Sequence, residues 1–245
     1  MLKLDHKKYK RPLIITSHPD DLEGFVGGLG YLLAHNVVSI VFAGGDRGVW
    51  DSTYEHLPLE EYIEIRKTES NAGGKVLGLS EILYLGYHDR EIPVNKITIQ
   101  QVLDQLERYQ PDVVISFEFF RFSTPYPHPD HMAVAQIVRN AVARYGLDHT
   151  LDYYVCSTLF PNRFVDVSAV RRIKLDALAC HTTQKGLNAI IFPFFERLLS
   201  KLWGIYIGAD YAEAYRKIYI PKLQKRLGIE TKVDVTFGES EAEGV

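Results

Sequence analysis

Short apolar runs that alternate with segments of helical periodicity restrict the fold of this chain more than any other feature. The apolar runs have the length and composition of strands, and they lie at residues 13–17, 37–43, 82–85, 113–117 and 151–158. Helical spacing of apolar residues occupies the segments 20–35, 59–77, 97–109 and 132–145. This alternation is typical of βαβ crossovers, in which helices cover both faces of a mostly parallel sheet. We therefore predict a doubly wound α/β fold.

The length of 245 residues suits one domain of the α/β class. After about residue 168 the pattern becomes helical and less regular, and from Gly228 onward the chain is polar and acidic. We predict a single domain over residues 1–245, in which residues 228–245 form a short C-terminal strand and a frayed acidic tail.

Composition and charge exclude several classes of partner. A net charge of -3 argues against a nucleic-acid-binding protein, which usually carries a basic face. The most apolar long stretch, residues 186–211, is interrupted by a proline and by charged residues, so it is too polar to span a bilayer. Cys156 and Cys180 are too few for a secreted disulfide framework. We expect a cytoplasmic protein with neither a membrane nor a nucleic-acid partner.

The tripeptide His-Pro-Asp occurs twice, at residues 18–20 and 128–130. With 9 histidines and 11 prolines among 245 residues, even one His-Pro pair is expected less than once by chance. Each copy lies at a transition into a helix, because proline favours the first helical turn and holds the preceding residue extended. The first and fourth strands of a doubly wound sheet are usually neighbours, and ligands bind between their carboxyl ends. We therefore expect the two segments to converge there.

The two segments together contribute six polar side chains, which are His18, Asp20, Asp21, His128, Asp130 and His131. Two imidazoles and a carboxylate, with one position open for water, form a common catalytic zinc site. A spare carboxylate could then take a proton from the water, and a spare imidazole could polarise or protonate the group under attack. Asp130 could orient one imidazole through its other nitrogen. The alternative is that the aspartates only cap their helices.

The pair of segments, His-Pro-Asp-Asp at 18–21 and His-Pro-Asp-His at 128–131, resembles the signature of the LmbE-like, or PIG-L, zinc N-deacetylases. The similarity extends over roughly residues 10–215. It implies the Rossmann-like fold of that family and one Zn²⁺ per chain, with another divalent ion as the alternative.

The same resemblance implies a role for each of the six side chains. The zinc ligands that it implies are His18, Asp21 and His131. It further implies Asp20 as the general base and His128 as the imidazole that stabilises the oxyanion, with Asp130 behind His128.

Three further residues are predicted to bind substrate. Arg66 and Glu69 match an Arg-x-x-Glu segment that lines the sugar site in relatives, although a surface ion pair on a helix is the alternative. Arg47 lies in the glycine-rich segment 44–48, which departs from the Thr-x-Gly-Glu pattern commoner in the family. Residues 181–184 are similar to a His-x-Ser-Gln segment of relatives.

The resulting hypothesis is a zinc-dependent hydrolase that removes the acetyl group from a small N-acetylated amino sugar. Two alternatives stay open: a zinc amidase that cleaves a larger amide of a glycoconjugate, and a non-catalytic carbohydrate-binding module. Asp20 and His128 speak against the module, because binding alone requires neither a base nor an acid. The aromatic residues of the segment 186–215 fit packing or a subunit interface, and we expect a homo-oligomer.

Overall fold

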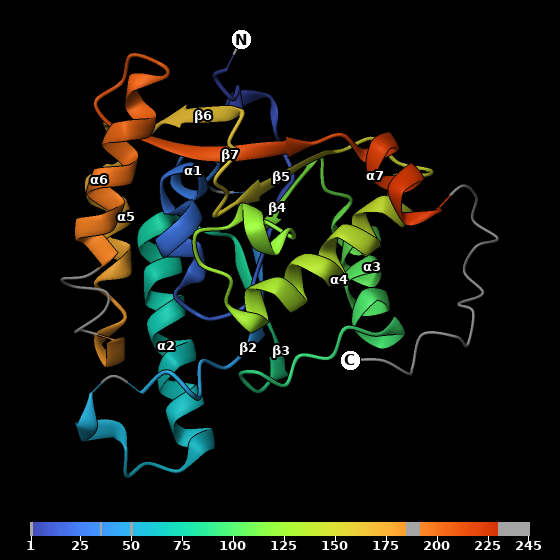
Figure 1. Ribbon diagram of the computed structural model, residues 1–245. Coiled ribbons are helices and arrows are strands. Elements are labelled where there is room, and N and C mark those ends of the chain that lie inside the picture. The colour runs from blue at the N-terminus through green and yellow to red at the C-terminus, as the bar shows by residue number, and fades with distance from the viewer. Residues whose placement is uncertain (1, 35, 50, 185–191, 230–245) are drawn as a thin grey trace.

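The computed structural model describes residues 2–34, 36–49, 51–184 and 192–229. At its centre lies a seven-stranded sheet in the order β3-β2-β1-β4-β5-β7-β6 (Figure 1). The strands are β1 (Pro12–Thr16), β2 (Val38–Ala43), β3 (Glu81–Tyr87), β4 (Val113–Phe117), β5 (Asp152–Cys156), β6 (Arg163–Asp166) and β7 (Ala212–Ile218). Strands β1 to β5 run parallel, whereas β7 is antiparallel to both β5 and β6. Strand order changes direction between β1 and β4, so the predicted doubly wound α/β class is confirmed.

The central strands are buried on both faces, as their continuous apolar runs predict. Every residue of β1 and of β4 is buried. In register, Leu13 of β1 pairs with Val38 of β2 on one side and with Val114 of β4 on the other. The side chains of these strands belong to one hydrophobic core. This rigid centre places the carboxyl ends of β1 and β4 side by side.

Seven α-helices of the described chain surround the sheet, and a π-helical turn (Leu22–Val26) precedes the first. They are α1 (Gly27–Leu32), α2 (Leu59–Leu77), α3 (Lys96–Tyr109), α4 (Pro129–Tyr145), α5 (Arg171–Leu178), α6 (Phe192–Ile205) and α7 (Ile220–Leu227). Helices α1, α2 and α5 pack together on one face of the sheet, and α3, α4 and α7 on the other (Figure 1). Within the described residues, no helix combines the length and the apolar character needed to cross a membrane.

The part of the chain after β5 differs most from the prediction. The strand expected at 151–158 ends at Cys156, and the helical pattern expected after residue 168 is interrupted by β7. Strand β7 has a buried glutamate, Glu213, so its sequence lacks a simple apolar pattern. Gly228 ends α7 in the left-handed conformation with φ 66°. A short strand and an acidic tail were expected over residues 228–245, and the part of this segment from residue 230 onward lies outside the described residues.

Glu213 of β7 fixes the start of helix α1. Its carboxylate accepts hydrogen bonds from the backbone N–H groups of Gly28 at 2.9 Å and Leu29 at 2.8 Å. Lys174 of α5 donates to the same carboxylate at 2.7 Å. A carboxylate at a helix N-terminus satisfies free N–H groups and interacts favourably with the helix dipole. Glu213 therefore joins β7, α5 and α1 behind the first His-Pro-Asp segment.

Asp152, at the start of β5, ties the N-terminal segment to the sheet. Its carboxylate lies 2.7 Å from Nζ of Lys8 and 2.6 Å from Nζ of Lys217, and Tyr9 donates a hydrogen bond to it. Burial alone would raise the pKa of Asp152, but the hydrogen bonds from Lys217, Lys8 and Tyr9 lower that pKa to about 2. The carboxylate is therefore ionised at neutral pH.

Candidate functional site

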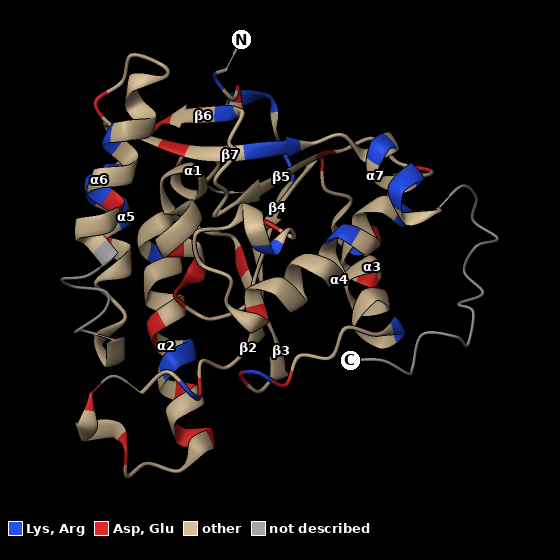
Figure 2. Ribbon diagram, viewed as in Figure 1, with Lys and Arg blue, Asp and Glu red and all other residues tan. Residues whose placement is uncertain are grey.

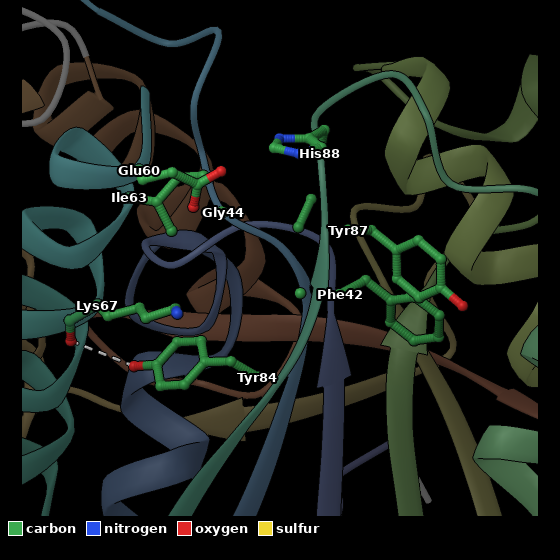
Figure 3. Close-up of a pocket in the computed structure, with 10 residues that line it drawn as sticks. Phe42, Gly44, Glu60, Ile63, Lys67, Tyr84, Tyr87 and His88 are labelled. Atoms are coloured by element: carbon green, nitrogen blue, oxygen red, sulfur yellow. Dashed lines mark hydrogen bonds between the residues drawn. The ribbon is translucent and has the colours of Figure 1, made fainter. Parts of the chain in front are cut away.

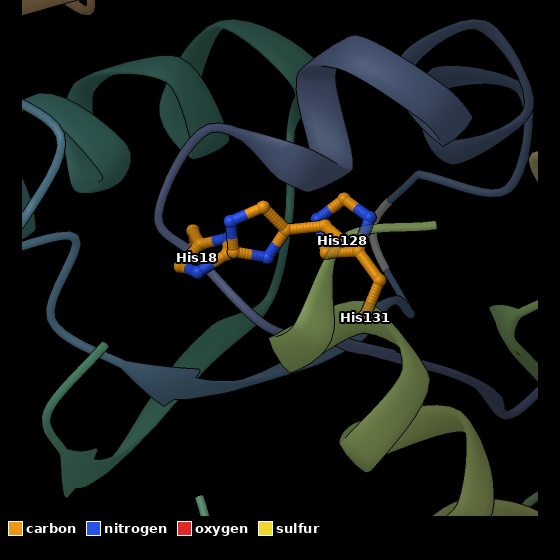
Figure 4. A group of neighbouring side chains, drawn as sticks. All are labelled: His18, His128 and His131. Carbon is orange, nitrogen blue, oxygen red and sulfur yellow. The ribbon is translucent and has the colours of Figure 1, made fainter. Parts of the chain in front are cut away.

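The two His-Pro-Asp segments meet at the carboxyl ends of β1 and β4, which are neighbours in the sheet. Figure 4 shows the rings of His18, His128 and His131 next to one another. Ring centroids lie 5.0 Å apart for His18 and His128, 5.4 Å for His18 and His131, and 5.1 Å for His128 and His131. One nitrogen of each ring lies within 4.8 Å of the others. The sequence-based expectation that these side chains converge agrees with the structure.

The carboxylate of Asp21 lies between two of these rings. Its Oδ1 is 3.1 Å from Nε2 of His131, and its Oδ2 is 3.4 Å from Nδ1 of His18. The backbone N–H groups of Ser17 and His18 also donate to Oδ2. Burial alone would raise the pKa of Asp21, but His131 and His18 hold it well below its usual range. Asp21 is therefore an ionised, oriented carboxylate beside both imidazoles.

Asp130 lies behind His18 rather than behind His128. Its Oδ2 is 3.0 Å from Nε2 of His18 but 3.9 Å from Nδ1 of His128, which is too long for a hydrogen bond. Both carboxylate oxygens accept the backbone N–H of Arg90 at 2.9 Å. Asp130 therefore orients His18 through Nε2, the ring nitrogen that faces away from Asp21. The resemblance had implied His128 as the partner of Asp130, and the structure shows His18 instead.

Asp89, which was not among the predicted site residues, adds a second carboxylate on the same side of His18. Its Oδ1 lies 3.9 Å from Nε2 of His18. The backbone N–H groups of Gly45 and Arg47 donate to Asp89 at 2.9 and 3.0 Å. His18, Asp89 and Asp130 thus form a further group of potential donors. The sequence signal was available, since Asp89 follows the third strand at the same edge of the sheet.

His128 is the N-cap of α4, and its Nδ1 accepts the backbone N–H of Asp130 at 3.3 Å. Because a backbone N–H can only donate, the proton of the neutral ring lies on Nε2. Burial, together with His18 and His131, lowers the pKa of His128 to about 4. His128 is therefore a neutral imidazole at neutral pH, with Nε2–H as its donor.

Asp20 is held by a buried arginine. Arg66 of α2 is 2% exposed, and its Nη2 donates to Oδ1 of Asp20 at 3.1 Å. Burial alone would lower the pKa of Arg66, but Asp20 raises it. On the other side of the guanidinium, Nη1 lies 3.6 Å from Oε2 of Glu69. The surface ion pair considered from the sequence is therefore buried.

Glu69 is itself enclosed by the turn that follows α5. Its Oε1 accepts one hydrogen bond from the hydroxyl of Thr182 and one from the backbone N–H of Thr183, each at 2.7 Å. Its Oε2 accepts the Thr183 hydroxyl at 2.6 Å. These contacts connect the 181–184 segment singled out in the sequence to Arg66, and through Arg66 to Asp20.

The loop after β2 approaches this network closely. Gly45 has φ +76°, a left-handed conformation that favours glycine, and a Cβ there would lie 2.8 Å from Nε of Arg66. The side chain of Arg47 points to the surface, where it pairs with Glu91 and is half exposed. Of the three predicted substrate-binding residues, only Arg47 is thus open to solvent.

The donor set fits a divalent metal ion. Imidazole nitrogens with a carboxylate oxygen are ligands typical of zinc. His131 stacks on Phe117 with centroids 3.9 Å apart and an interplanar angle of 4°, which holds its ring. Its Nδ1 is buried and has no hydrogen-bond partner within the described part of the chain. The other ring nitrogen, Nε2, lies 3.1 Å from Oδ1 of Asp21, a separation at which both atoms could bind one ion.

Two hollows are lined by residues that neighbour the site residues in the chain. A cavity of about 110 Å³ between α2 and β3 is lined by residues that include Lys67, Tyr84 and His88 (Figure 3). A groove of about 490 Å³ is lined by Phe119, Phe120, Arg121, Phe122, Pro127, Pro129, Met132 and Gln136. This groove lies beside His128 in the chain and has the size of a small-molecule site.

Fold and site together define a hydrolase-type centre, and sequence comparison assigns it to a family. The PIG-L family, described as GlcNAc-PI de-N-acetylase, matches residues 13–142, and the chain belongs to this family. The resemblance found in the sequence is thereby confirmed.

Individual relatives of the chain are named as deacetylases. The diacetylchitobiose deacetylase of Thermococcus kodakarensis is 26% identical over 84% of this chain and 82% of its own. A probable N-acetyl-alpha-D-glucosaminyl L-malate deacetylase 2 of Bacillus cereus is 29% identical over 70% of this chain and 82% of its own. Among solved structures, N,N'-diacetylchitobiose deacetylase from Pyrococcus horikoshii has a TM-score of 0.79 at 26% identity, covering 96% of this chain and 92% of that one.

Proposed function

We propose that this protein is a metal-dependent hydrolase that removes the acetyl group from an N-acetylated amino sugar, a derivative of N-acetylglucosamine. The observation that carries the proposal is the convergence of His18, Asp21, His128 and His131, with Asp20 directly before Asp21 in the chain. Family membership and the names of the relatives support the same reaction. A binding module alone requires no such pair of proton-transfer groups.

The residues that would hold the ion are His18, Asp21 and His131, and we propose one zinc ion per chain. When bound, zinc supplies Lewis acidity toward the amide carbonyl and makes water more acidic. Asp130 and Asp89 act on His18 from its other side. A carboxylate behind a histidine ligand fixes the orientation of the ring and increases its basicity.

Asp20 is proposed as the general base. Its carboxylate accepts the proton of the attacking water, and Arg66 holds Oδ1 of that carboxylate in place. Glu69 in turn holds Arg66. In this proposal, Arg66 and Glu69 therefore act through Asp20. The resemblance had implied instead that both residues contact the sugar directly.

His128 is proposed to stabilise the developing oxyanion. Its Nε2–H donates to the carbonyl oxygen as negative charge accumulates there, and donors of this kind contribute about 3 kcal/mol. Because Nδ1 is engaged by the Asp130 backbone, the donor does not have to change tautomer during the reaction.

We assign the sugar and its substituent to the surface around His128 and Arg47. The half-exposed Arg47 can donate hydrogen bonds to hydroxyl groups. The aromatic groove of about 490 Å³ can accept the part of the substrate beyond the acetamide. Cys156 and Cys180 are both free, which fits a reducing compartment, and we propose the cytoplasm.

Acetate release from purified, zinc-loaded protein tests the proposal. The substrates are N-acetylglucosamine, diacetylchitobiose, N-acetylglucosaminyl malate and a simple N-acetyl amino acid. The control is Asp20→Asn, which keeps size and hydrogen bonding but cannot accept the proton, and we expect it to lose at least about a hundredfold in kcat with unchanged zinc content. Hydrolysis of the amino acid alone would reject the sugar assignment. Turnover by Asp20→Asn equal to that of the wild-type protein would exclude Asp20 as the general base.

A further inference from the structure

Helix α6 carries polar side chains on its buried side and apolar side chains on its exposed side. Glu196 and Ser200 are 7% and 4% exposed. Toward solvent, the large apolar side chains of this helix and of the turn after it are Phe194, Phe195, Leu198, Leu199, Leu202, Ile205 and Tyr206. We call these seven side chains the α6 apolar face. A helix on the surface of a monomer normally has the opposite distribution.

Buried ion pairs prevent the helix from rotating to hide this face. Glu196 accepts hydrogen bonds from Arg171 of α5, at 2.7 Å from Nη2, and lies 3.9 Å from Nζ of Lys174. Lys174 is bonded in turn to Glu213 of β7. Separating such buried charges is strongly unfavourable. Within the described part of the chain, the α6 apolar face therefore stays exposed.

The size of the face matches half of a protein interface. Each of its seven side chains is between 43% and 76% exposed. With about 100 Å² left open on each, the face presents about 700 Å². This exceeds the patch of about 300–600 Å² that is usual for a monomer and approaches the roughly 800 Å² that each partner contributes to a standard interface. Figure 1 shows α6 at the outer edge of the molecule, and in Figure 2 its ribbon is mostly tan.

We propose that the α6 apolar face binds the same face of a second copy of this chain. A two-fold arrangement lets one patch cover another without any further complementary surface. It also specifies the contact for the homo-oligomer expected from the sequence. The area matches what a stable interface requires, and the helix has only two exposed cations, Arg197 and Lys201.

A lipid surface fits the same face less well. Lys201 lies over the ring of Tyr211 at 5.7 Å and is thus engaged within the chain. The chain has a net charge of -3, whereas helices that lie on anionic membranes are rich in lysine and arginine. A second copy is therefore the occupant that the observations favour.

Sedimentation velocity of the full chain over a range of concentrations tests this contact. The wild-type mass is expected to be at least twice 28.0 kDa. The double variant Leu198→Glu/Ile205→Glu is expected to sediment at 28.0 kDa with an unchanged circular dichroism spectrum. The matched control is Ile97→Glu on α3, where the side chain is 68% exposed outside the face, and it is expected to keep the wild-type mass.

Three results would overturn the proposal: a wild-type mass of 28.0 kDa at every concentration, a double variant that keeps the wild-type mass, or a control that dissociates equally. If the double variant does not fold, hydrogen exchange of the wild-type protein decides. Amides of residues 194–206 are expected to gain protection at high concentration, and unchanged exchange there would refute the contact. Flotation of a 28.0-kDa wild-type chain with phosphatidylserine vesicles would reassign the face to lipid.

Discussion

Arg66→Met removes the buried cation between Asp20 and Glu69. The arginine is 2% exposed, with Nη2 at 3.1 Å from Asp20 and Nη1 at 3.6 Å from Glu69. Methionine keeps much of the length and apolar packing of the side chain but has no charge. Glu69, which is 6% exposed, then stays buried without its cation.

The expected loss of stability follows from these contacts. Removing one partner of a buried ion pair costs about 3–5 kcal/mol. Glu69 keeps its hydrogen bonds from Thr182 and Thr183, and the side chain of Asp20 is 17% exposed, so the lower value of about 3 kcal/mol applies. For a chain of this length the melting temperature should fall by about 6–12 °C. Thermal and urea unfolding followed by circular dichroism measures both quantities.

The double variant Arg66→Met/Glu69→Gln is the matched control. Glutamine removes the stranded charge while its carbonyl oxygen still accepts a hydrogen bond, so at least about 1 kcal/mol should be recovered. A loss below about 1 kcal/mol in the single variant, or no recovery in the double variant, would refute the reasoning. Kinetics separate the two roles considered for Arg66. A fall in kcat indicates that it positions Asp20, whereas a rise in KM alone would indicate direct contact with the sugar.

Further predictions concern the metal, the oxyanion and acid stability. Alanine at His18, Asp21 or His131 should remove most of the bound zinc measured by mass spectrometry without loss of helix content, and stoichiometric zinc in all three would contradict the assignment. His128→Ala should retain zinc and lose about 10²–10³ in kcat with little change in KM; wild-type turnover would exclude His128. Asp152→Asn should cost about 1 kcal/mol at neutral pH, after allowance for solvent screening. The pKa of Asp152 is about 2 in the folded state and about 3.9 in the unfolded state. Urea unfolding should therefore show that the difference in stability between wild type and Asp152→Asn disappears as the pH falls from about 4 to 2. A difference that does not depend on pH would argue against the ion pairs.

The central parallel strands could be predicted because they are buried on both faces. Such strands are continuous apolar runs, and β1 and β4 are recognisable without any tertiary information. Strand β7 was not recognisable in this way. Its Glu213 is buried because Lys174 and the N-terminus of α1 satisfy it, and these partners are distant in the sequence.

For the site, the convergence of the histidines was predictable and the partners of the carboxylates were not. The topology brings His18 and His131 together whenever β1 and β4 are neighbours. The direction of Asp130 depends instead on the N–H of Arg90, which has φ 63° in the loop after β3. The burial of Arg66 likewise depends on a turn more than a hundred residues later in the chain. Contacts of this kind have no local signal.

The loops around the proposed metal ligands are joined through main-chain N–H groups. Asp89 accepts from Gly45 and Arg47, and Asp130 accepts from Arg90. A main-chain donor is present whatever side chain the residue carries, proline excepted. The side chain at position 47 can therefore be exchanged without loss of the frame that orients His18, whereas position 90, with φ 63°, favours glycine and asparagine. With Arg47 in the proposed contact with the sugar, substrate choice and the orientation of His18 rest on separate atoms of this residue, so position 47 is suitable for a library that seeks new acylated sugars while conserving the hydrolytic step.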